Sequence, residues 1–321
     1  MEGLQTTWGW ILAVDLFCSG LGAGVFIIAA LLALTTGERF KKTVRFGAWA
    51  GAIAIVVGVV FLLLDVGKPF RAIVLFNSFD NLGSWMARGA WLLFSAILIY
   101  GLFALLWTEP VLKWLESKVK FVYKTRTLWR VLLAILGILV SLGVAAYTGI
   151  LLSTLPFRSL WNSWWVPAVF GASALLTGGA LMLAFVSLRE KGAKALQIVL
   201  AVWVLLLVAA EAFVLWKYLT AAQAGSADLV RSVETLLGGS LGTAFWVVVV
   251  GLGLAVPLLW VLFRLTGLRA LQAAVIPIVG VVSCLIGGWT LRFLILSAGL
   301  PNALTSPAFS QALDGVKWLV K

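Results

Sequence analysis

The chain has no histidine, only two cysteines and few charged residues among its 321 positions. Haem held between membrane helices depends on histidine ligands, so a haem-carrying cytochrome of this kind is excluded. Cys18 and Cys284 are too few for an iron–sulfur cluster or a structural zinc site. We therefore expect both cysteines to be small packing residues, and any chemistry to occur within the bundle or on a partner.

Charged residues make up only 11% of the chain, whereas 63% of the residues are hydrophobic. No water-soluble domain of this size has such a composition, so the sequence predicts a membrane protein. About 20 apolar residues are needed to cross the hydrocarbon layer. The long runs rich in Leu, Val and Ala predict helices, not the short alternating strands of a barrel. The predicted spans are 8–35, 44–65, 85–107, 128–152, 165–187, 195–219, 241–263 and 270–296.

The fold class expected from these runs is an all-α membrane protein with eight transmembrane helices. We divide it into two four-helix bundles, 1–152 and 153–321, and place the functional site in the first. Two connecting segments are amphipathic, 110–123 and 228–237. Each is expected to lie on the membrane surface or to dock a partner.

Acidic residues are half as numerous as basic ones, which leaves a net charge of +12. In a membrane protein such an excess is explained by topology and not by a nucleic-acid partner. With both termini on the extracytoplasmic side, most of the 24 lysines and arginines fall in cytoplasmic connections. These are Arg39, Lys41, Lys42, Arg45, Lys113, Lys118, Lys120, Lys124, Arg126, Arg130, Arg189, Lys191, Lys194, Arg264 and Arg269. The sequence therefore predicts a multi-pass protein of the cell membrane with both termini outside.

Ionisable side chains inside the spans are costly and commonly mark a functional site. In this topology they gather in the outer leaflet, although their helices run in both directions. The residues concerned are Asp15, Asp65, Arg88, Glu211 and Arg292, with Tyr147 near the outer end of its span and Arg158 in the loop that follows. One-sided placement is unlike a transporter, whose substrate site lies near the midplane. It indicates a site that is entered from the outer leaflet.

Asp15 is the strongest candidate within this group. Cys18, Ser19 and Gly22 follow it at helical spacing, which places a stripe of small side chains beside the carboxyl group. The stripe would leave room for a ligand. The alternative is that Asp15 only bonds a neighbouring helix or pairs with an arginine. Tyr147 has a similar alternative, because tyrosines near a membrane face often belong to an aromatic belt.

The stretch FLLLDVGKPFRAIVLF, residues 61–76, ends the second span. Asp65 closes the helix, a turn follows, and Lys68 and Arg71 add positive charge at the outer surface. Arg88 opens the third span within reach of that turn. One interpretation is a solvated loop with an internal Asp–Arg pair. The other is a docking platform for a redox partner beside a small-molecule pocket.

Several motifs of the chain resemble those of the NrfD/PsrC family, the membrane subunits of polysulfide-reductase-like complexes. They are GLGAG in the first span, LDVGKPFRAIVLF after the second, SWMARGAW at the start of the third, YTGILLS at the end of the fourth, SALLTGGAL in the fifth and GGWTLRFLILSAG in the eighth. Each motif is weakly specific, but their order and spacing extend over nearly all eight spans.

The resemblance implies a subunit without prosthetic groups that binds menaquinone or ubiquinone near the outer face. It also implies partners, namely an iron–sulfur subunit with several clusters and a molybdopterin catalytic subunit. In the family, a polar residue of the first helix and the tyrosine of the fourth contact the quinone headgroup, and these correspond to Asp15 and Tyr147. Some members have histidine at the first position and asparagine one turn earlier, where this chain has Asp15 and Leu12.

The residues themselves suggest the same chemistry. Quinol oxidation releases two protons, so it needs a hydrogen-bond donor and a titratable acceptor. Tyr147 can donate, and Asp15 can take the proton. We expect Ser19, Lys68, Arg71, Arg88 and Arg158 to surround the headgroup, and Asp65 to pass the proton outward. The chain would not be catalytic alone. The competing hypothesis is a redox-driven ion-translocating module without stable quinone binding.

Overall fold

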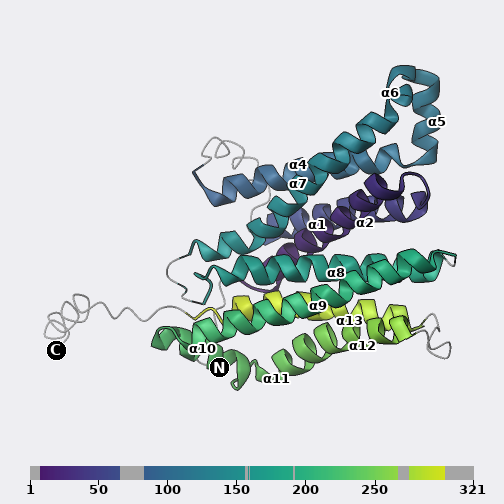
Figure 1. The fold of residues 1–321 in the computed structure, drawn as a ribbon. Helices are drawn as coiled ribbons and strands as arrows, with labels where there is room; N and C mark the ends of the chain where they lie inside the picture. Colours follow the sequence, from purple (N-terminus) through teal and green to yellow (C-terminus); the bar gives the residue numbers. More distant parts are fainter. Residues whose placement is uncertain are drawn as a thin grey trace, which may run out of the picture.

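The computed structural model describes residues 8–65, 83–155, 158, 160–190, 192–266 and 275–300. Within these ranges the regular structure is helical (Figure 1). The helices are α1 (Trp10–Thr36), α2 (Lys41–Asp65), α4 (Trp85–Leu106), α5 (Glu109–Lys118), α6 (Lys120–Lys124), α7 (Arg126–Ser153), α8 (Trp165–Arg189), α9 (Lys194–Gln223), α10 (Ala227–Leu237), α11 (Gly242–Ala244), η3 (Phe245–Ala255), α12 (Val256–Thr266) and α13 (Val275–Ser297).

Eight helices in the described part of the chain are long and apolar enough to cross a membrane. Seven of these spans are single helices. The remaining one, Gly242–Thr266, is the seventh in chain order and consists of α11, η3 and α12. The predicted all-α membrane fold is thus confirmed. The sixth span runs to Gln223, beyond the predicted end, because no glycine or proline interrupts the helix before Gly225.

The seventh span contains a feature that the hydrophobic pattern does not reveal. Residues Phe245–Ala255 are wound as a π-helix, with one more residue in each hydrogen-bonded turn than in an α-helix. Gly253 of this segment lies against Gly287 of α13 so closely that a Cβ atom on either would meet the other's backbone. The extra residue of the π-helix changes which side chains face α13 and α9.

Helix α1 occupies the centre of the arrangement, because it contacts α2, α7, α8 and α13. In Figure 1, α2, α4 and α7 lie on one side of it, and α8, α9, α12 and α13 on the other. The division into bundles 1–152 and 153–321 remains a prediction. The contacts show that α1 packs against α2 and α7 with one part of its surface and against α8 and α13 with another.

The contact between α1 and α8 is a backbone contact. A Cβ atom on Gly24 would collide with the carbonyl group of Ala174, and one on Gly178 would collide with the backbone of Gly24. Small residues permit such an approach in membrane helices, where packing and not the hydrophobic effect holds helices together. Gly24 belongs to the GLGAG motif, but the sequence does not identify the helix that it meets.

The connections at one end of the bundle are tied together by charge. Arg130 donates to the carbonyl oxygen of Leu106 and to Glu38 Oε1 at 2.7 Å, and its guanidinium group lies over the ring of Trp107. The hydrogen bond from Arg130 holds the pKa of Glu38 below its ordinary value. Lys41 pairs with Glu109 at 3.1 Å. These contacts fix α5 beside the ends of α1 and α2.

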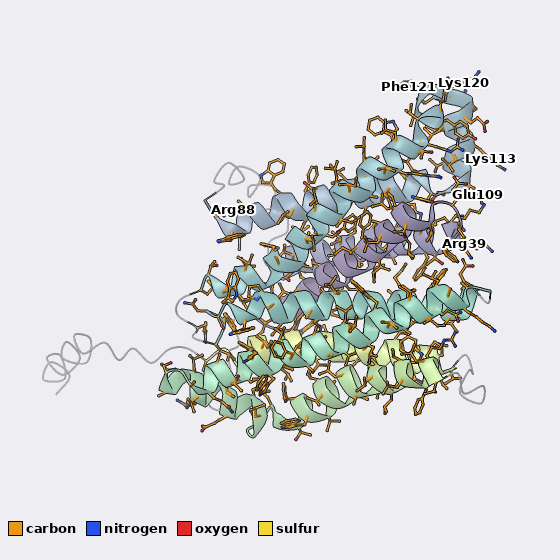
Figure 2. All side chains as sticks on the ribbon, viewed as in Figure 1. Arg39, Arg88, Glu109, Lys113, Lys120 and Phe121 are labelled. Carbon is orange, nitrogen blue, oxygen red and sulfur yellow. The ribbon has the colours of Figure 1, made fainter. Side chains whose placement is uncertain are left out.

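The amphipathic segment 110–123 forms two helices, α5 and α6, with Val119 between them. Figure 2 places Arg39, Glu109, Lys113, Lys120 and Phe121 at this end of the molecule and Arg88 at the opposite end. The second amphipathic segment is α10, which lies at the end away from α5 and α6 in Figure 1. The two amphipathic segments therefore lie at opposite ends of the bundle.

The first prediction concerns the glycine contact of α1 and α8. We expect Gly178→Ala to lower the melting temperature and the yield of the purified protein, because the added methyl group forces two backbones apart. Overpacking of this kind commonly destabilises by about 1–3 kcal/mol. Thermal unfolding monitored by circular dichroism measures the effect. Gly171→Ala is the matched control in the same helix, since a Cβ atom there meets nothing within 4 Å; equal melting of the two variants would contradict the prediction.

The second prediction concerns the membrane sides. The predicted topology puts the α5 and α6 end in the cytoplasm and both chain termini outside. A reporter enzyme that works only in the cytoplasm should be active when inserted after Val119 and inactive when inserted into the loop at Gly225. A reporter that works only outside should show the reverse. The opposite pair of results would invert the topology.

Candidate functional site

Asp15 and Ser19 form a buried polar pair on α1. The Ser19 hydroxyl group donates to Asp15 Oδ1 at 3.1 Å, and the two residues are 1–5% exposed. Their spacing of four residues puts them on one face of the helix. Of the alternatives drawn from the sequence, an ion pair of Asp15 with an arginine is not formed among the residues that the structure describes.

Helix α2 faces this pair with a glycine. A Cβ atom on Gly58 would lie 2.7 Å from Ser19 Oγ and 3.1 Å from Asp15 Oδ1, so only a glycine leaves the carboxyl and hydroxyl groups undisturbed. Further along α1, Gly22 lies against the backbone of Gly51. The stripe of small side chains that was expected to leave room for a ligand is therefore partly occupied by α2.

Tyr147 reaches the same region from α7. Its side chain is 5% exposed, and its phenol ring lies directly on Gly89 of α4, where a Cβ atom would overlap the ring and the hydroxyl oxygen. A side chain buried in this way is not a membrane-facing belt residue. Within the described ranges, the Tyr147 hydroxyl makes no hydrogen bond.

The structure brings three of the predicted residues together. Asp15 lies within electrostatic range of both Asp65 and Tyr147. Asp65 is the last residue of α2 and is half-buried. Four helices thus contribute to one cluster, which we call the Asp15 cluster: Asp15 and Ser19 from α1, Gly58 and Asp65 from α2, Gly89 from α4 and Tyr147 from α7. It combines two carboxyl groups, an aliphatic hydroxyl and a phenol.

Two predicted arginines have other contacts. The guanidinium group of Arg88 lies over the ring of Trp85 on its own helix, 4.7 Å from the centroid. Arg158 donates to the carbonyl oxygen of Gly299 at 2.8 Å and lies over Trp161. Arg158 therefore joins the loop after α7 to the end of α13. Lys68 and Arg71 fall outside the described residues.

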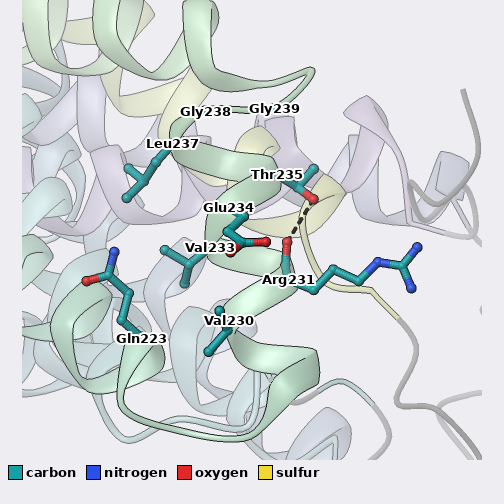
Figure 3. A pocket seen from close by; sticks show the side chains of 9 residues that line it. All are labelled: Gln223, Val230, Arg231, Val233, Glu234, Thr235, Leu237, Gly238 and Gly239. Atoms are coloured by element: carbon teal, nitrogen blue, oxygen red, sulfur yellow. Dashed lines mark hydrogen bonds between the residues drawn. The ribbon is translucent and has the colours of Figure 1, made fainter.

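Two hollows in the described part of the protein lie away from the Asp15 cluster. The larger is an open groove of about 690 Å³ along α10, lined by Gln223, Val230, Arg231, Val233, Glu234, Thr235, Leu237, Gly238 and Gly239 (Figure 3). Its wall carries one positive and one negative side chain and is otherwise mostly apolar. The smaller hollow lies inside the bundle between α8, α9, η3 and α13.

A family model described as "Polysulphide reductase, NrfD" matches residues 2–302. The chain belongs to the NrfD family. It is 28% identical over 305 residues to the C subunit of polysulfide reductase from Wolinella succinogenes, with 91% of this chain and 94% of the relative covered. It is 29% identical over 318 residues to protein NrfD of Escherichia coli, with the same coverage. An Hdr-like menaquinol oxidoreductase integral membrane subunit of Archaeoglobus fulgidus is 26% identical over 183 residues, which cover 56% of this chain and 42% of the relative.

The family assignment made from six short motifs is thus confirmed, and with it the multi-pass membrane character of the chain. The motifs also contain parts of the Asp15 cluster. Gly89 belongs to SWMARGAW and Tyr147 to YTGILLS, and the structure shows that these two motifs of the NrfD chain meet where the phenol ring lies on the glycine. The spacing of motifs along the sequence does not indicate such a contact.

Sequence reasoning missed the two glycines of the cluster. At positions 58 and 89 only a glycine fits beside the candidate side chains Ser19 and Tyr147. The chain has 32 glycines, and most of those in spans serve helix packing, so no signal in the sequence singled these two out. The sequence did indicate that Ser19, four residues after Asp15, lies on the same helix face as the carboxyl group.

The third prediction tests Gly89 as the residue that positions Tyr147. We expect Gly89→Ala to displace the phenol ring, because the methyl group would occupy the place of the ring. Tyrosine fluorescence is obscured by the 17 tryptophans, so ultraviolet resonance Raman of the tyrosine bands is the measurement. Gly101→Ala, in the same helix and with nothing within 4 Å, is the control. An unchanged spectrum in Gly89→Ala that matches Gly101→Ala would contradict the placement of Tyr147.

Proposed function

We propose that the chain is the membrane anchor subunit of a respiratory oxidoreductase complex. In this proposal it binds quinone or quinol near the extracytoplasmic face and exchanges electrons with an iron–sulfur subunit docked there. The observation that carries the proposal is the Asp15 cluster, a buried carboxyl group hydrogen-bonded to Ser19, with the phenol of Tyr147 from another helix within electrostatic range.

The donor set of the cluster fits a quinone headgroup. A quinone has two carbonyl oxygens that accept hydrogen bonds, and when bound it supplies two-electron, two-proton redox chemistry. The Tyr147 hydroxyl has no partner in the described ranges and is available to donate. Glycines at 58 and 89 keep side chains from filling the space beside Asp15 and around the phenol ring. In this proposal Asp15 and Tyr147 are the residues that contact the quinone, and Gly58 and Gly89 are the residues that position them.

Each residue then has a defined task. Tyr147 would donate a hydrogen bond to one carbonyl oxygen of the ligand, and Asp15 would accept a proton or return it in the reverse direction. Ser19 fixes the orientation of the Asp15 carboxyl group through the 3.1 Å hydrogen bond. Asp65, at the end of α2, takes the proton toward the aqueous side. Ser19, Lys68, Arg71, Arg88 and Arg158 remain our proposed surroundings of the headgroup.

The proposed partners follow from what this subunit does not carry and from its relatives. Two separate cysteines and no histidine leave it without ligands for a haem or a cluster, so electrons must pass to another subunit. The relative from Wolinella succinogenes is named as part of polysulfide reductase, and the one from Archaeoglobus fulgidus as a subunit of a menaquinol oxidoreductase. We propose an iron–sulfur subunit with several clusters as the direct partner, joined to a molybdopterin catalytic subunit.

A second candidate function is a redox-driven ion-translocating module without stable quinone binding. One observation favours it, since Glu211 and Arg292 are buried in the second half of the chain and have no task in the quinone proposal. The two functions separate in liposomes. Electron flow through the assembled complex should require added quinone under the first proposal and should continue without it under the second.

The fourth prediction concerns Asp15. In the assembled complex, Asp15→Asn should lower quinone-linked turnover by about 10²–10⁴-fold, because the amide cannot take the proton. Electron transfer from an artificial donor to the catalytic partner should stay at the wild-type rate. The comparison is made by measuring quinol oxidation and dye oxidation on the same preparation.

The control for this experiment is Glu116→Gln, which makes the same chemical change at an exposed carboxyl group of α5. It should leave both rates unchanged. Normal quinone-linked turnover in Asp15→Asn would remove Asp15 as the proton acceptor, and equal losses in both activities would indicate failed assembly instead. Tyr147→Phe should weaken quinone binding, visible as a higher KM for quinol.

A further inference from the structure

Arg292 of α13 is the largest fully buried side chain of the described structure. Its Nη1 atom donates to Ser173 Oγ at 3.1 Å and to the carbonyl oxygen of Gly288 at 2.8 Å, and its Nη2 donates to the carbonyl oxygen of Phe170. The Nε atom is buried without a hydrogen-bond partner in the described ranges. No carboxylate lies within ion-pair distance among those residues. The guanidinium group therefore has polar contacts but no direct neutralising charge.

Glu211 of α9 is the acidic residue that faces this arginine. It is 4% exposed, and its carboxyl group lies within hydrogen-bonding reach of Ser173, the same hydroxyl that accepts from Arg292. The order Arg292, Ser173, Glu211 thus joins three helices, α13, α8 and α9. Ser173 therefore bridges the guanidinium group of Arg292 and the carboxyl group of Glu211, which are not in direct contact.

Glu211 also borders a hollow inside the bundle. Glu211 Oε2 is buried and has no hydrogen-bond partner in the described part of the chain. Glu211 is one of the residues that line the inner hollow between α8, α9, η3 and α13, whose space between the atoms is about 180 Å³ and which admits no water molecule. Val249 and Gly253 of the π-helix form one wall, and Cys284 and Gly287 of α13 another.

Neither charge state of this carboxyl group is fully satisfied by the packing. As an anion, Glu211 would leave a bare charged oxygen in a dry hollow, which is unfavourable. As a neutral acid, it would leave Arg292 as an uncompensated buried cation. A group held between two such states binds or releases a proton in response to a small change in its surroundings.

We propose that Glu211 is a proton-binding site of this chain, separate from Asp15, with Ser173 and Arg292 as the groups that control it. A proton from the aqueous phase converts the carboxylate to the carboxylic acid, and its release restores the negative charge that faces Arg292. The titratable and charged groups around the site are Arg292 and Cys284 on α13 and, on the Arg292 side, Cys18 on α1. Helix α8 contributes the hydroxyls of Ser173 and Thr177, and the η3 residues that line the hollow are apolar.

The site reaches α1 through Arg292. Its guanidinium group lies against Gly20 and the ring of Phe17, on the face of α1 that carries neither Asp15 nor Ser19. A Cβ atom on Gly20 would lie 2.8 Å from Arg292 Nη2. A change in the charge balance of Arg292 and Glu211 therefore acts on the helix that also carries the Asp15 cluster.

The test is infrared spectroscopy of the purified complex from about pH 5 to about pH 9, a range that includes the pKa values reported for buried carboxyl groups. The protonated form of Glu211 should give a carbonyl stretching band that decreases as the pH rises and shifts in heavy water. Glu211→Gln should lose this band, whereas Asp15→Asn should keep it. Because no quinone is needed, the outcome does not depend on the proposed function.

A second variant guards against a folding defect. Ser173→Ala keeps the carboxyl group but removes its hydrogen bond, so the Glu211 band should move to higher frequency. Identical spectra of Glu211→Gln and the wild type throughout the titration would overturn the proposal. So would a Glu211 band that stays constant with pH, since it would show a carboxyl group that does not exchange its proton. If Glu211→Gln fails to fold, an unshifted band in Ser173→Ala overturns the proposal in its place.

Discussion

The backbone contact between α1 and α8 is the constraint on which the rest of this structure depends. Gly24 and Gly178 let the two helices approach until a methyl group on either would collide with main-chain atoms. Because α1 also contacts α2, α7 and α13, this approach fixes both its depth and its rotation. The rotation in turn decides which face of α1 carries Asp15 toward α2 and which face carries Gly20 toward Arg292.

Polar groups inside a membrane protein must find partners within the bundle, because lipid offers none. In this chain the solution differs on the two sides of α1. On one side, Asp15 bonds Ser19 within its own helix, and glycines of α2 and α4 let those helices pack directly against the polar side chains. On the other side, Arg292 takes carbonyl oxygens of two helices and a serine that it shares with Glu211. Side chains that were expected to form one outer group thus belong to two clusters, with α1 between them.

Much of the fold could be predicted because the hydrocarbon layer sets the length and the composition of each span. The ends of seven spans lie within about four residues of the predicted ones, and the family followed from motif order. The π-helix could not be predicted, because Phe245–Ala255 is apolar throughout and its pattern does not distinguish a π-helix from an α-helix. In the site, Asp15 and Ser19 were readable from their spacing. The glycines opposite them were not, because a glycine that makes room for a side chain is indistinguishable in sequence from one that makes room for a helix.

The sequence by itself determined that this is an eight-span helical membrane protein, roughly where each span begins and ends, and that it lacks the ligands for haem or clusters. These properties are local, because each depends on a short run of residues and on the solvent around it. Tertiary structure alone decided that Tyr147 meets Gly89, that Arg158 joins the end of α13, and that Glu211 faces Arg292 through Ser173. Those contacts depend on the rotation of one helix against another, which close packing between distant segments sets and no single segment encodes.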